Sequence, residues 1–375
     1  MRSILTTFLL ICIALGVQNC STQPDKETSE SSGSTNWEIG PFEKISSQNP
    51  VLLPIDSSTF FCPIRQENVF WESKDVFNPA ALVRNDTLFL IYRAEDKVGI
   101  FAGTSRLGLA YSLDGSSFTR LPEPIFYPDN DEYKRYEWEG GAEDPRIVET
   151  EDGRYVLTYT SYDGEYARLC IAETTDLVEW KKHGPVFTKA YDGRFLDHWS
   201  KAGAIICRKE GDKFIATRIN DKYWMYWGDT DLFLASSDDL ANWTPVLEED
   251  GSVKSVLKPR EKMFDSRLVE SGPPAFITEN GIVLLYNGMN LDTGGDQELP
   301  AGTYASGQAL FDANDPSKLI DRTDTYFLYP DQEYEILGQI GNVCFIEGLV
   351  NYRGSWFLYY GTADSKIAVA TAKSE

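Results

Sequence analysis

Apolar and polar residues alternate in short, strand-length runs along most of this chain, and the runs form a recurring unit. Each unit reads as an apolar strand, a turn and a second apolar strand, which in most copies ends near a tyrosine. The five copies are NPAALVRNDTLFLIYRAED, EDPRIVETEDGRYVLTYTSYD, KAGAIICRKEGDKFIATRIND, GPPAFITENGIVLLYNGMN and FIEGLVNYRGSWFLYYGTAD. We anchor the five copies at Pro79, Pro145, Ala202, Pro273 and Ile346. Successive anchors are separated by 66, 57, 71 and 73 residues. This spacing predicts a repeat architecture.

Most units continue into a third strand with a shared ending, as in LGLAYSLDGSSF, LCIAETTDLVEW, LFLASSDDLANW and the shorter KIAVATA. Period-two alternation and Asp-Gly, Asn-Gly or Arg-Gly turns, without amphipathic helical stretches between the strands, predict sheets rather than βαβ units. The sequence therefore predicts an all-β fold, a five-bladed β-propeller. The last unit has only three evident strands, so residues 51–65 are predicted to add the fourth and close the ring.

The residues that open the units are expected to converge, because the first strand of each propeller blade lies near the central axis. These positions are rich in polar groups: Asn78, Glu143 and Asp144, Lys201, residues 270–272, and residues 345–347. A ring of such side chains predicts a pocket at the axis.

The first 20 residues predict a secretory signal outside the fold. Arg2 precedes the apolar run ILTTFLLICIALGV, which is too short for a stable transmembrane helix. The run ends in VQNC at Cys20, which resembles a bacterial lipoprotein processing site, so we expect export and a lipid anchor, at an outer membrane or in the periplasm. Ordinary cleavage with Cys20 incidental is the alternative. Residues 21–40 predict a disordered tether, and residues 41–375 the propeller catalytic domain.

The net charge of the chain limits the classes of partner that it can bind. There are 58 acidic and 35 basic residues, a formal net charge of −23, which argues against nucleic acids and anionic membranes as partners. Cysteines lack metal-type spacing and there are only two histidines, so we expect neither a metal nor a cofactor. Cys170 and Cys207 fit apolar strand patterns and predict small buried side chains. Nothing in the sequence indicates an oligomeric state.

Carboxylates remain as the candidate acid and base, and glycosidic bonds are the substrates that paired carboxylates open. Three stretches combine carboxylates with glycine, proline or aromatic residues: WEGGAEDPRI at 138–147, FDSRLVESGPP at 264–274, and YWGDTD at 226–231. In the first, the glycines permit close backbone approach to a ligand. Each stretch also has a plain structural interpretation, as a turn before a strand, a charged loop or a turn at a blade edge.

The motifs GGAEDPRI, NPAALV, SGPP with LLYNG, and WFLYYGTAD together resemble glycoside hydrolase family 130, over residues 77–370. That family contains mannoside phosphorylases and β-mannosidases on five-bladed propellers. The resemblance implies an oligosaccharide substrate containing mannose. It also implies that Asp144 is the general acid, delivering its proton through a sugar hydroxyl, and that Glu143 and Arg146 hold this carboxylate and the sugar.

Departures from the phosphorylase pattern favour the hydrolytic branch of the family. Phosphorylases hold phosphate with basic residues, including a histidine in a turn where this chain has Asn287, and an Arg-Pro pair is replaced by Arg218-Ile219. In the hydrolytic branch, acids precede the Gly-Pro-Pro element and follow the Tyr-Trp-Gly turn. Glu270 and Asp229 stand there, with Asp231 as the alternative to Asp229. Carboxylates at these positions repel phosphate and favour water.

The resemblance thus implies an inverting β-mannoside hydrolase acting on β-1,2 linkages at chain ends. Asp144 protonates the leaving oxygen, and Glu270, assisted by Asp229, activates water. The expected contacts to sugar hydroxyls are Asn78, Arg93, Lys201 and Asp265. One alternative is a mannoside phosphorylase that releases mannose 1-phosphate and holds phosphate with Arg93, Arg168 or Lys201. Another is a non-catalytic glycan-binding lipoprotein.

Overall fold

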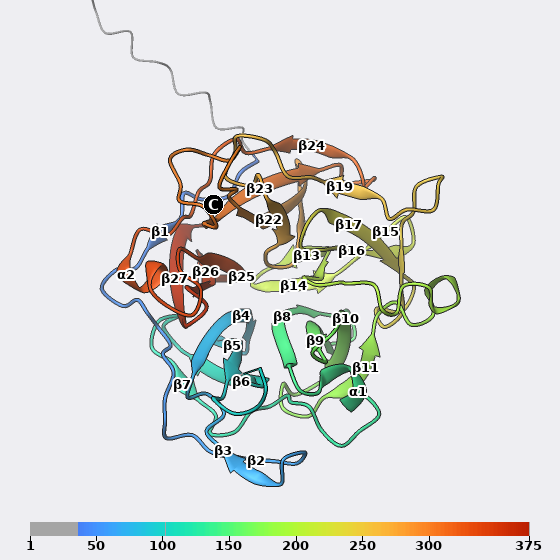
Figure 1. The fold of residues 1–375 in the computed structure, drawn as a ribbon. Coiled ribbons are helices and arrows are strands. Elements are labelled where there is room, and N and C mark those ends of the chain that lie inside the picture. The colour runs from blue at the N-terminus through green and yellow to red at the C-terminus, as the bar shows by residue number, and fades with distance from the viewer. Residues whose placement is uncertain (1–36, 102, 375) are drawn as a thin grey trace, which may run out of the picture. The chain divides into compact units, whose positions relative to one another are not determined.

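The structure is a computed structural model that describes residues 37–101 and 103–374, and in this part the chain is almost entirely β (Figure 1). The helical elements of the described part are α1 (Lys134–Glu137), α2 (Glu333–Ile336) and the 3₁₀ turn η1 (Ala190–Gly193). No helix within these residues has the length and apolarity to span a membrane. The predicted signal, Cys20 and most of the predicted tether lie outside the described residues.

The strands form successive antiparallel groups that match the sequence units. The first two groups are β4 (Asp75–Arg84), β5 (Thr87–Glu95), β6 (Ser105–Ser112) and β7 (Thr119–Arg120), then β8 (Gly141–Glu149), β9 (Tyr155–Tyr162), β10 (Ala167–Thr174) and β11 (Lys181–Pro185). Alternating side chains pack against neighbouring groups, and the turn between β4 and β5 uses Asn85 and Asp86, with φ of 52° and 54°. Such residues tolerate the left-handed conformation that a tight hairpin needs.

Shorter strands make up the third group. They are β12 (Ala204–Ile205), β13 (Cys207–Glu210), β14 (Lys213–Ala216), β15 (Arg218–Ile219), β16 (Lys222–Trp227), β17 (Leu232–Ser237), β18 (Trp243–Pro245) and β19 (Ser255–Leu257). The fourth group comprises β20 (Leu268–Ser271), β21 (Phe276–Thr278), β22 (Gly281–Met289), β23 (Tyr304–Phe311) and β24 (Leu319–Arg322), and the fifth β25 (Cys344–Tyr352), β26 (Ser355–Thr362) and β27 (Lys366–Lys373). In Figure 1, β4, β8, β14 and β25 surround a common centre, and β4 contacts both β8 and β25.

The outer strand of the fifth group comes from earlier in the chain than predicted. β1 (Glu43–Lys44) pairs with β27, with Lys44 opposite Ala370. Residues 51–65 were expected in this role, but they contribute only an isolated bridge from Leu52 to Ile367. The later part of that segment enters a separate hairpin of β2 (Phe60–Cys62) and β3 (Glu67–Val69). The sheet edge is therefore covered as expected, but by a different segment.

The folded domain also begins before residue 41. Trp37 is buried in the largest apolar cluster, and its indole Nε1 donates to Asp321 Oδ2 at 2.9 Å. The polar composition of the surrounding segment places residues 37–40 in the predicted tether. In the structure they belong to the folded unit, and the Ile39 N–H donates to Gln308 in the fourth group. Cys170 and Cys207 are buried, as predicted, and the structure shows both as free thiols.

Candidate active site

Irregular pairing in three inner strands directs polar side chains to the centre. The register shifts at Asn78 in β4, between Glu143 and Arg146 in β8, and at Glu347 in β25. Asn78 and Asp144 have φ of 45° and 47°. A β-bulge re-aims the side chains of its strand, so an otherwise apolar strand can present a carboxylate or amide toward the axis. The bulges explain why these polar residues occur in strands that are buried along most of their length.

Arg93 joins the first two groups by hydrogen bonds to several carboxylates. Its Nη1 donates to Asp144 Oδ1 at 3.1 Å, and its Nη2 donates to Glu143 Oε1 at 3.0 Å and to Glu95 Oε1 at 2.7 Å. Asn78 Nδ2 donates to the same Asp144 oxygen at 2.9 Å. The predicted convergence of Asn78 and Asp144 is therefore present, and the structure adds Arg93 to them. The two donors, Asn78 and Arg93, fix the orientation of the Asp144 carboxylate.

Arg146 has a different role from Arg93. Its Nε and Nη2 each donate at 2.7 Å to main-chain carbonyls, those of Gly272 and Ser271. Its Nη1 lies 2.7 Å from Glu347 Oε1. Arg146 thus holds the chain next to Glu270 against the strand that carries Asp144. It connects the two predicted catalytic carboxyls without contacting the Asp144 carboxylate itself.

Lys201 lies among the carboxylates of the site. Burial alone would lower its pKa, but Glu143, Glu270, Asp144 and Asp229 outweigh this effect and raise the pKa above its usual value. Its Nζ forms no hydrogen bond or ion pair within the described residues and lies 5.4 Å from the centre of the Trp199 ring. The four acids that act on it come from the second, third and fourth strand groups, so Lys201 marks the place where these groups meet.

The two predicted catalytic carboxyls have opposite pKa shifts. Burial, together with the negative charges of Asp229 and Asp144, raises the pKa of Glu270 to about 8 against the opposing effects of Lys201 and Arg146. For Asp144, burial also acts upward, but Arg93, Lys201 and the Asn78 hydrogen bond prevail and lower the pKa. At neutral pH in the free protein, Asp144 is therefore charged and Glu270 holds a proton. The roles implied by the family resemblance need the proton on Asp144 instead.

Asp229 belongs to the site of Glu270 and Lys201. Its charge is among the main causes of their pKa shifts, whereas that of Asp231 is not. Asp229 Oδ2 accepts a 2.8 Å hydrogen bond from Trp199 Nε1. Its negative charge contributes to the pKa shifts of both Glu270 and Lys201. Of the two candidates left open by the sequence, Asp229 is the one next to Glu270.

The structure does not bring Asp265 into this group. Its carboxylate is completely buried and accepts from Arg260 Nη2 at 2.9 Å, Arg322 Nη2 at 2.6 Å and the Tyr286 hydroxyl at 2.8 Å. With its acceptor positions occupied by these donors, Asp265 stabilises the fourth group. The expectation of a sugar contact from Asp265 is not supported.

Asp364 and Tyr304 also belong to the site but were not singled out from the sequence. Burial and the negative charge of Asp144 raise the pKa of Asp364 to about 7, although Arg93 acts to lower it. Burial and then Glu270 and Asp364 raise the pKa of Tyr304. A signal existed for Asp364, because an acid closes the second strand in most units. Glu347, within the predicted ring, is completely buried, and burial raises its pKa well above the usual range.

Apart from Lys201, the residues that bear on phosphate binding lie elsewhere or are already engaged. The side chain of Asn287, at the position of the phosphorylase histidine, exchanges hydrogen bonds with the main chain of Ile346. Arg168 pairs with Asp163 and Asp197. Arg218 is exposed and donates to two main-chain carbonyls. Within the described residues, no group of three or more His, Cys, Asp and Glu side chains is arranged to hold a metal.

Comparisons with known proteins identify relatives of this chain in sequence and in structure. Residues 49–375 match the sequence profile of the family described as beta-1,4-mannooligosaccharide phosphorylase, glycoside hydrolase family 130. A 1,2-beta-oligomannan phosphorylase from Thermoanaerobacter sp. (strain X514) is 32% identical over 86% of this chain and 95% of that protein.

Two solved structures are more similar in sequence. A glycosyl hydrolase from Bacteroides ovatus is 48% identical with a TM-score of 0.88, covering 91% of this chain and 98% of that one. The second comes from work stating that the GH130 family of mannoside phosphorylases contains glycoside hydrolases that target beta-1,2 mannosidic linkages in Candida mannan. It is 48% identical with a TM-score of 0.89, covering 92% and 98% of the two chains.

Proposed function

This chain belongs to glycoside hydrolase family 130, an enzyme family that acts on β-mannosides, and we propose that it is an inverting hydrolase of β-1,2-mannosidic bonds at chain ends. The solved structures at 48% identity support the hydrolytic choice, because one is named a glycosyl hydrolase and the other comes from work on hydrolases of β-1,2 linkages. The 32% identical relative is named a phosphorylase, so the choice rests on the site itself.

The observation that carries the proposal is the charge of the site. Glu270 and Asp229 act on the same Lys201 as Glu143 and Asp144 do. The two guanidinium groups nearby are already bonded, that of Arg93 to carboxylates and that of Arg146 mainly to carbonyls. A phosphate dianion needs several charge-assisted donors that are not already engaged. Of Arg93, Arg146 and Lys201, only Lys201 has no ion pair within the described residues, and the four carboxylates around it offset its charge. A neutral water molecule has no such need, and a carboxylate can orient it.

The mechanism uses one proton shared by Asp144 and Glu270. In the active form, Asp144 holds the proton and delivers it to the leaving oxygen through a sugar hydroxyl, while ionised Glu270 takes a proton from the attacking water. The free protein favours the other arrangement, with the proton on Glu270. Both arrangements contain the same number of protons, so kinetics report macroscopic pKa values of the pair rather than of either residue.

We extend the proposal to the architecture and the location. The strand groups around a common centre are consistent with the five blades of a β-propeller, and the pairing of β1 with β27 supports closure of that ring. The apolar run before Cys20 supports export with a lipid anchor. The proposed partner is a mannooligosaccharide, without a metal or cofactor.

Product analysis tests the proposed reaction. The protein is incubated with β-1,2-mannobiose, with and without inorganic phosphate, and the anomers are followed by NMR. Free mannose formed at the same rate without phosphate, with α-mannose as the first anomer released from the non-reducing end, is the expected result. Mannose 1-phosphate formed only with phosphate would establish the alternative phosphorylase reaction.

A variant pair separates hydrolysis from binding alone. Glu270→Gln is expected to lose hydrolysis while it still binds mannobiose, because the amide cannot accept the proton of water. Arg168→Gln removes a cation held by Asp163 and Asp197, away from Glu270, and should hydrolyse at the wild-type rate. Binding of mannobiose by the wild-type protein with no product in any tube would favour the non-catalytic glycan-binding alternative.

A further inference from the structure

Three aromatic side chains from different parts of the chain form a row at the edge of the candidate active site. The ring centres of Phe101 and Tyr162 are 5.7 Å apart, and those of Tyr162 and Trp199 are 6.5 Å apart. Trp199 is 46% exposed and Phe101 is 39% exposed, although such large apolar side chains are highly buried on average. Neighbouring exposed apolar side chains of this kind commonly mark a binding surface.

The inner end of the row adjoins the carboxylates of the site. The indole Nε1 of Trp199 donates to Asp229 Oδ2 at 2.8 Å, and the centre of the Trp199 ring lies 5.4 Å from Lys201 Nζ. Asp229 is the acid next to Glu270, the proposed base. Trp199 is therefore fixed to the inner site by the polar edge of its ring, while much of the ring remains accessible.

The other two rings lie on the side of the proposed acid. Tyr162 is the last residue of β9 and pairs with Gly141 of β8, the strand that carries Asp144. Phe101 follows β5, the strand that carries Arg93, and Arg93 donates to Asp144. The row therefore passes from the side of the proposed base to the side of the proposed acid.

Glycines allow the two outer rings to lie directly against the main chain. A Cβ atom at Gly140 would lie 2.4 Å from the Tyr162 ring, and one at Gly164 would lie 2.4 Å from the Phe101 ring. The Tyr162 hydroxyl also donates to the carbonyl of Gly164 at 3.1 Å. Both rings are thus held in place before any ligand binds, and a ligand that packs on them does not have to order them.

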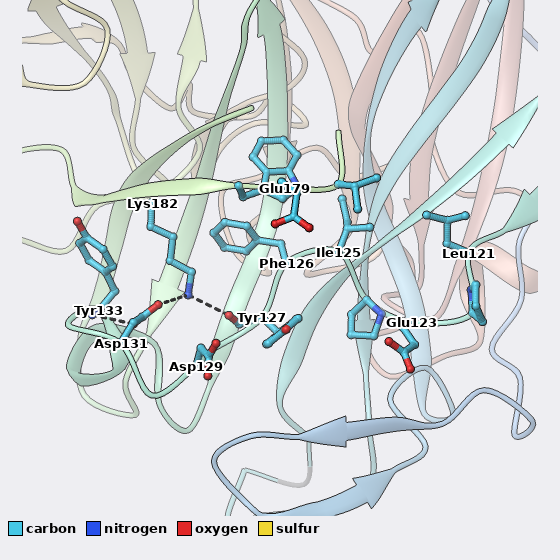
Figure 2. Close-up of a pocket in the computed structure, with 14 residues that line it drawn as sticks. Leu121, Glu123, Ile125, Phe126, Tyr127, Asp129, Asp131, Tyr133, Glu179 and Lys182 are labelled. Carbon is cyan, nitrogen blue, oxygen red and sulfur yellow. Dashed lines mark hydrogen bonds and ion pairs between the residues drawn. The ribbon is translucent and has the colours of Figure 1, made fainter. Parts of the chain in front are cut away.

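A cavity on the outer strands is a separate feature, and none of the three rings lines it (Figure 2). It lies between residues 121–133 and residues 178–182. Its cation, Lys182, is already held by Glu137 Oε2 at 2.6 Å and by the carbonyl of Tyr127 at 2.9 Å. Of these two surfaces, the aromatic row is the one that adjoins the inner carboxylates.

The position of the row indicates which part of a substrate it would contact. A sugar ring has an apolar face of C–H groups, which packs favourably against the electron-rich face of an aromatic ring. In an inverting mechanism the acid protonates the leaving oxygen, while the base activates water on the opposite face of the reacting sugar. The leaving group therefore lies on the acid side, where Tyr162 and Phe101 lie. If one unit is removed from a chain end, all remaining units extend along this side.

We propose that Tyr162 and Phe101 bind the leaving-group part of the substrate, and that the enzyme therefore prefers chains of three or more units to the disaccharide. Tyr162 contacts the first unit beyond the cleaved bond, and Phe101 contacts the second. Trp199 lies at the inner end of the row, next to the reacting unit. This inference rests on the proposed function, because it takes mannose as the sugar and the chain end as the place of cleavage.

Calorimetric titration of the full chain with β-1,2-mannobiose and β-1,2-mannotriose tests this surface. Asp144→Asn serves as the background because it prevents turnover, so the affinities do not depend on whether the wild-type protein hydrolyses or phosphorolyses its substrate. The triose is expected to bind about tenfold more tightly than the biose, on the order of what one further aromatic contact contributes. Adding Phe101→Ala should remove this advantage, whereas Phe101→Tyr, which keeps a ring at the same place, should retain it.

Tyr111→Ala is the matched control for Phe101→Ala. Tyr111 is also 39% exposed and has a ring partner, Phe89, at 6.3 Å, but it lies near the end of β6 that is farther from Phe101. This variant should retain the preference for the triose. Equal affinities for the two ligands in Asp144→Asn, a preference that survives Phe101→Ala, or one that Phe101→Tyr or Tyr111→Ala abolishes would overturn this inference and leave the proposed reaction untouched. Binding of neither ligand would contradict the proposed substrate, and this inference with it.

Discussion

Acidic residues occupy two kinds of place in this protein, and their environments act in opposite directions. At the end of the third strand in three units, Asp114, Asp176 and Asp239 each accept hydrogen bonds from two main-chain N–H groups a few residues further on. These turns hold the charged form, and the pKa of each carboxyl is lowered. At the inner site, burial raises the pKa values of Glu143, Glu270 and Asp364.

The difference shows which carboxylates stabilise the fold and which are available for chemistry. A turn aspartate is charged at every ordinary pH, and its oxygens are occupied by the backbone. At the inner site, the pKa values of Glu270, about 8, and Asp364, about 7, are close to the pH at which these groups gain or lose a proton. Asp144 is the exception, because Arg93, Lys201 and Asn78 lower its pKa. Perturbed pKa values of this kind cluster at functional sites. The repeated motif therefore marks structure, and the bulges that interrupt the repeat mark the site.

The largest difference in activity should appear when an aspartate is replaced by asparagine, once at the inner site and once in a turn. Asp144→Asn is expected to lower kcat about 10²- to 10⁴-fold, the usual contribution of a positioned acid, while its thermal unfolding remains cooperative. Asp176→Asn is the matched change in a turn and should retain the wild-type kcat. Steady-state rates on β-1,2-mannobiose measure both. Equal rates for wild type and Asp144→Asn would remove Asp144 from the chemistry.

The second effect is a shift in pH dependence. Since the pair needs one proton, kcat/KM should be highest between the lowered pKa of Asp144 and the pKa of Glu270 at about 8, and should fall above the latter. Asp229 raises the pKa of Glu270, so Asp229→Asn should move the upper limb to lower pH, in addition to any loss of rate. The full pH profile of both proteins is the measurement. An upper limb unchanged by Asp229→Asn would show that Glu270 does not set it.

Much of the fold and part of the site could be predicted from the sequence because each depends on local pattern. Strand pairs follow period-two alternation, and the residues that open the units, such as Asn78 and Asp144, lie together as expected. Asp265 could not be placed, because one of its arginine partners is 57 residues away in sequence. Asp364 was missed because an acid after a second strand resembles an ordinary turn residue, and only the folded chain places it beside Arg93. The opposite pKa shifts of Asp144 and Glu270 depend on burial, which no sequence pattern gives.

The smallest expected effect is a difference in stability between variants of two adjacent acids, Asp238 and Asp239, at one turn. Asp239 accepts from the N–H groups of Ala241 and Asn242 at 2.9 and 2.8 Å, and the turn places the buried Leu240 at a φ of 65°. Asp238 is exposed, and its carboxylate forms one ion pair among the described residues, with Lys222. Asp239→Ala is expected to lower the free energy of unfolding by about 1–2 kcal/mol, and Asp238→Ala by less than about 0.5 kcal/mol. Urea unfolding measures both.

The stability lost in Asp239→Ala should depend on pH in one direction. The folded pKa of Asp239 is below its ordinary value of 3.8, so its stabilisation is complete above that value and is lost as the pH falls through the folded pKa. The gap between wild type and Asp239→Ala should therefore be constant near neutrality and narrow in acid. Glu270 is the opposite case, because its raised pKa makes the charged form costly in the folded state. Glu270→Gln should therefore stabilise the fold more at pH 8 than at pH 5, and the same trend in both variants would contradict the distinction between turn and site carboxylates.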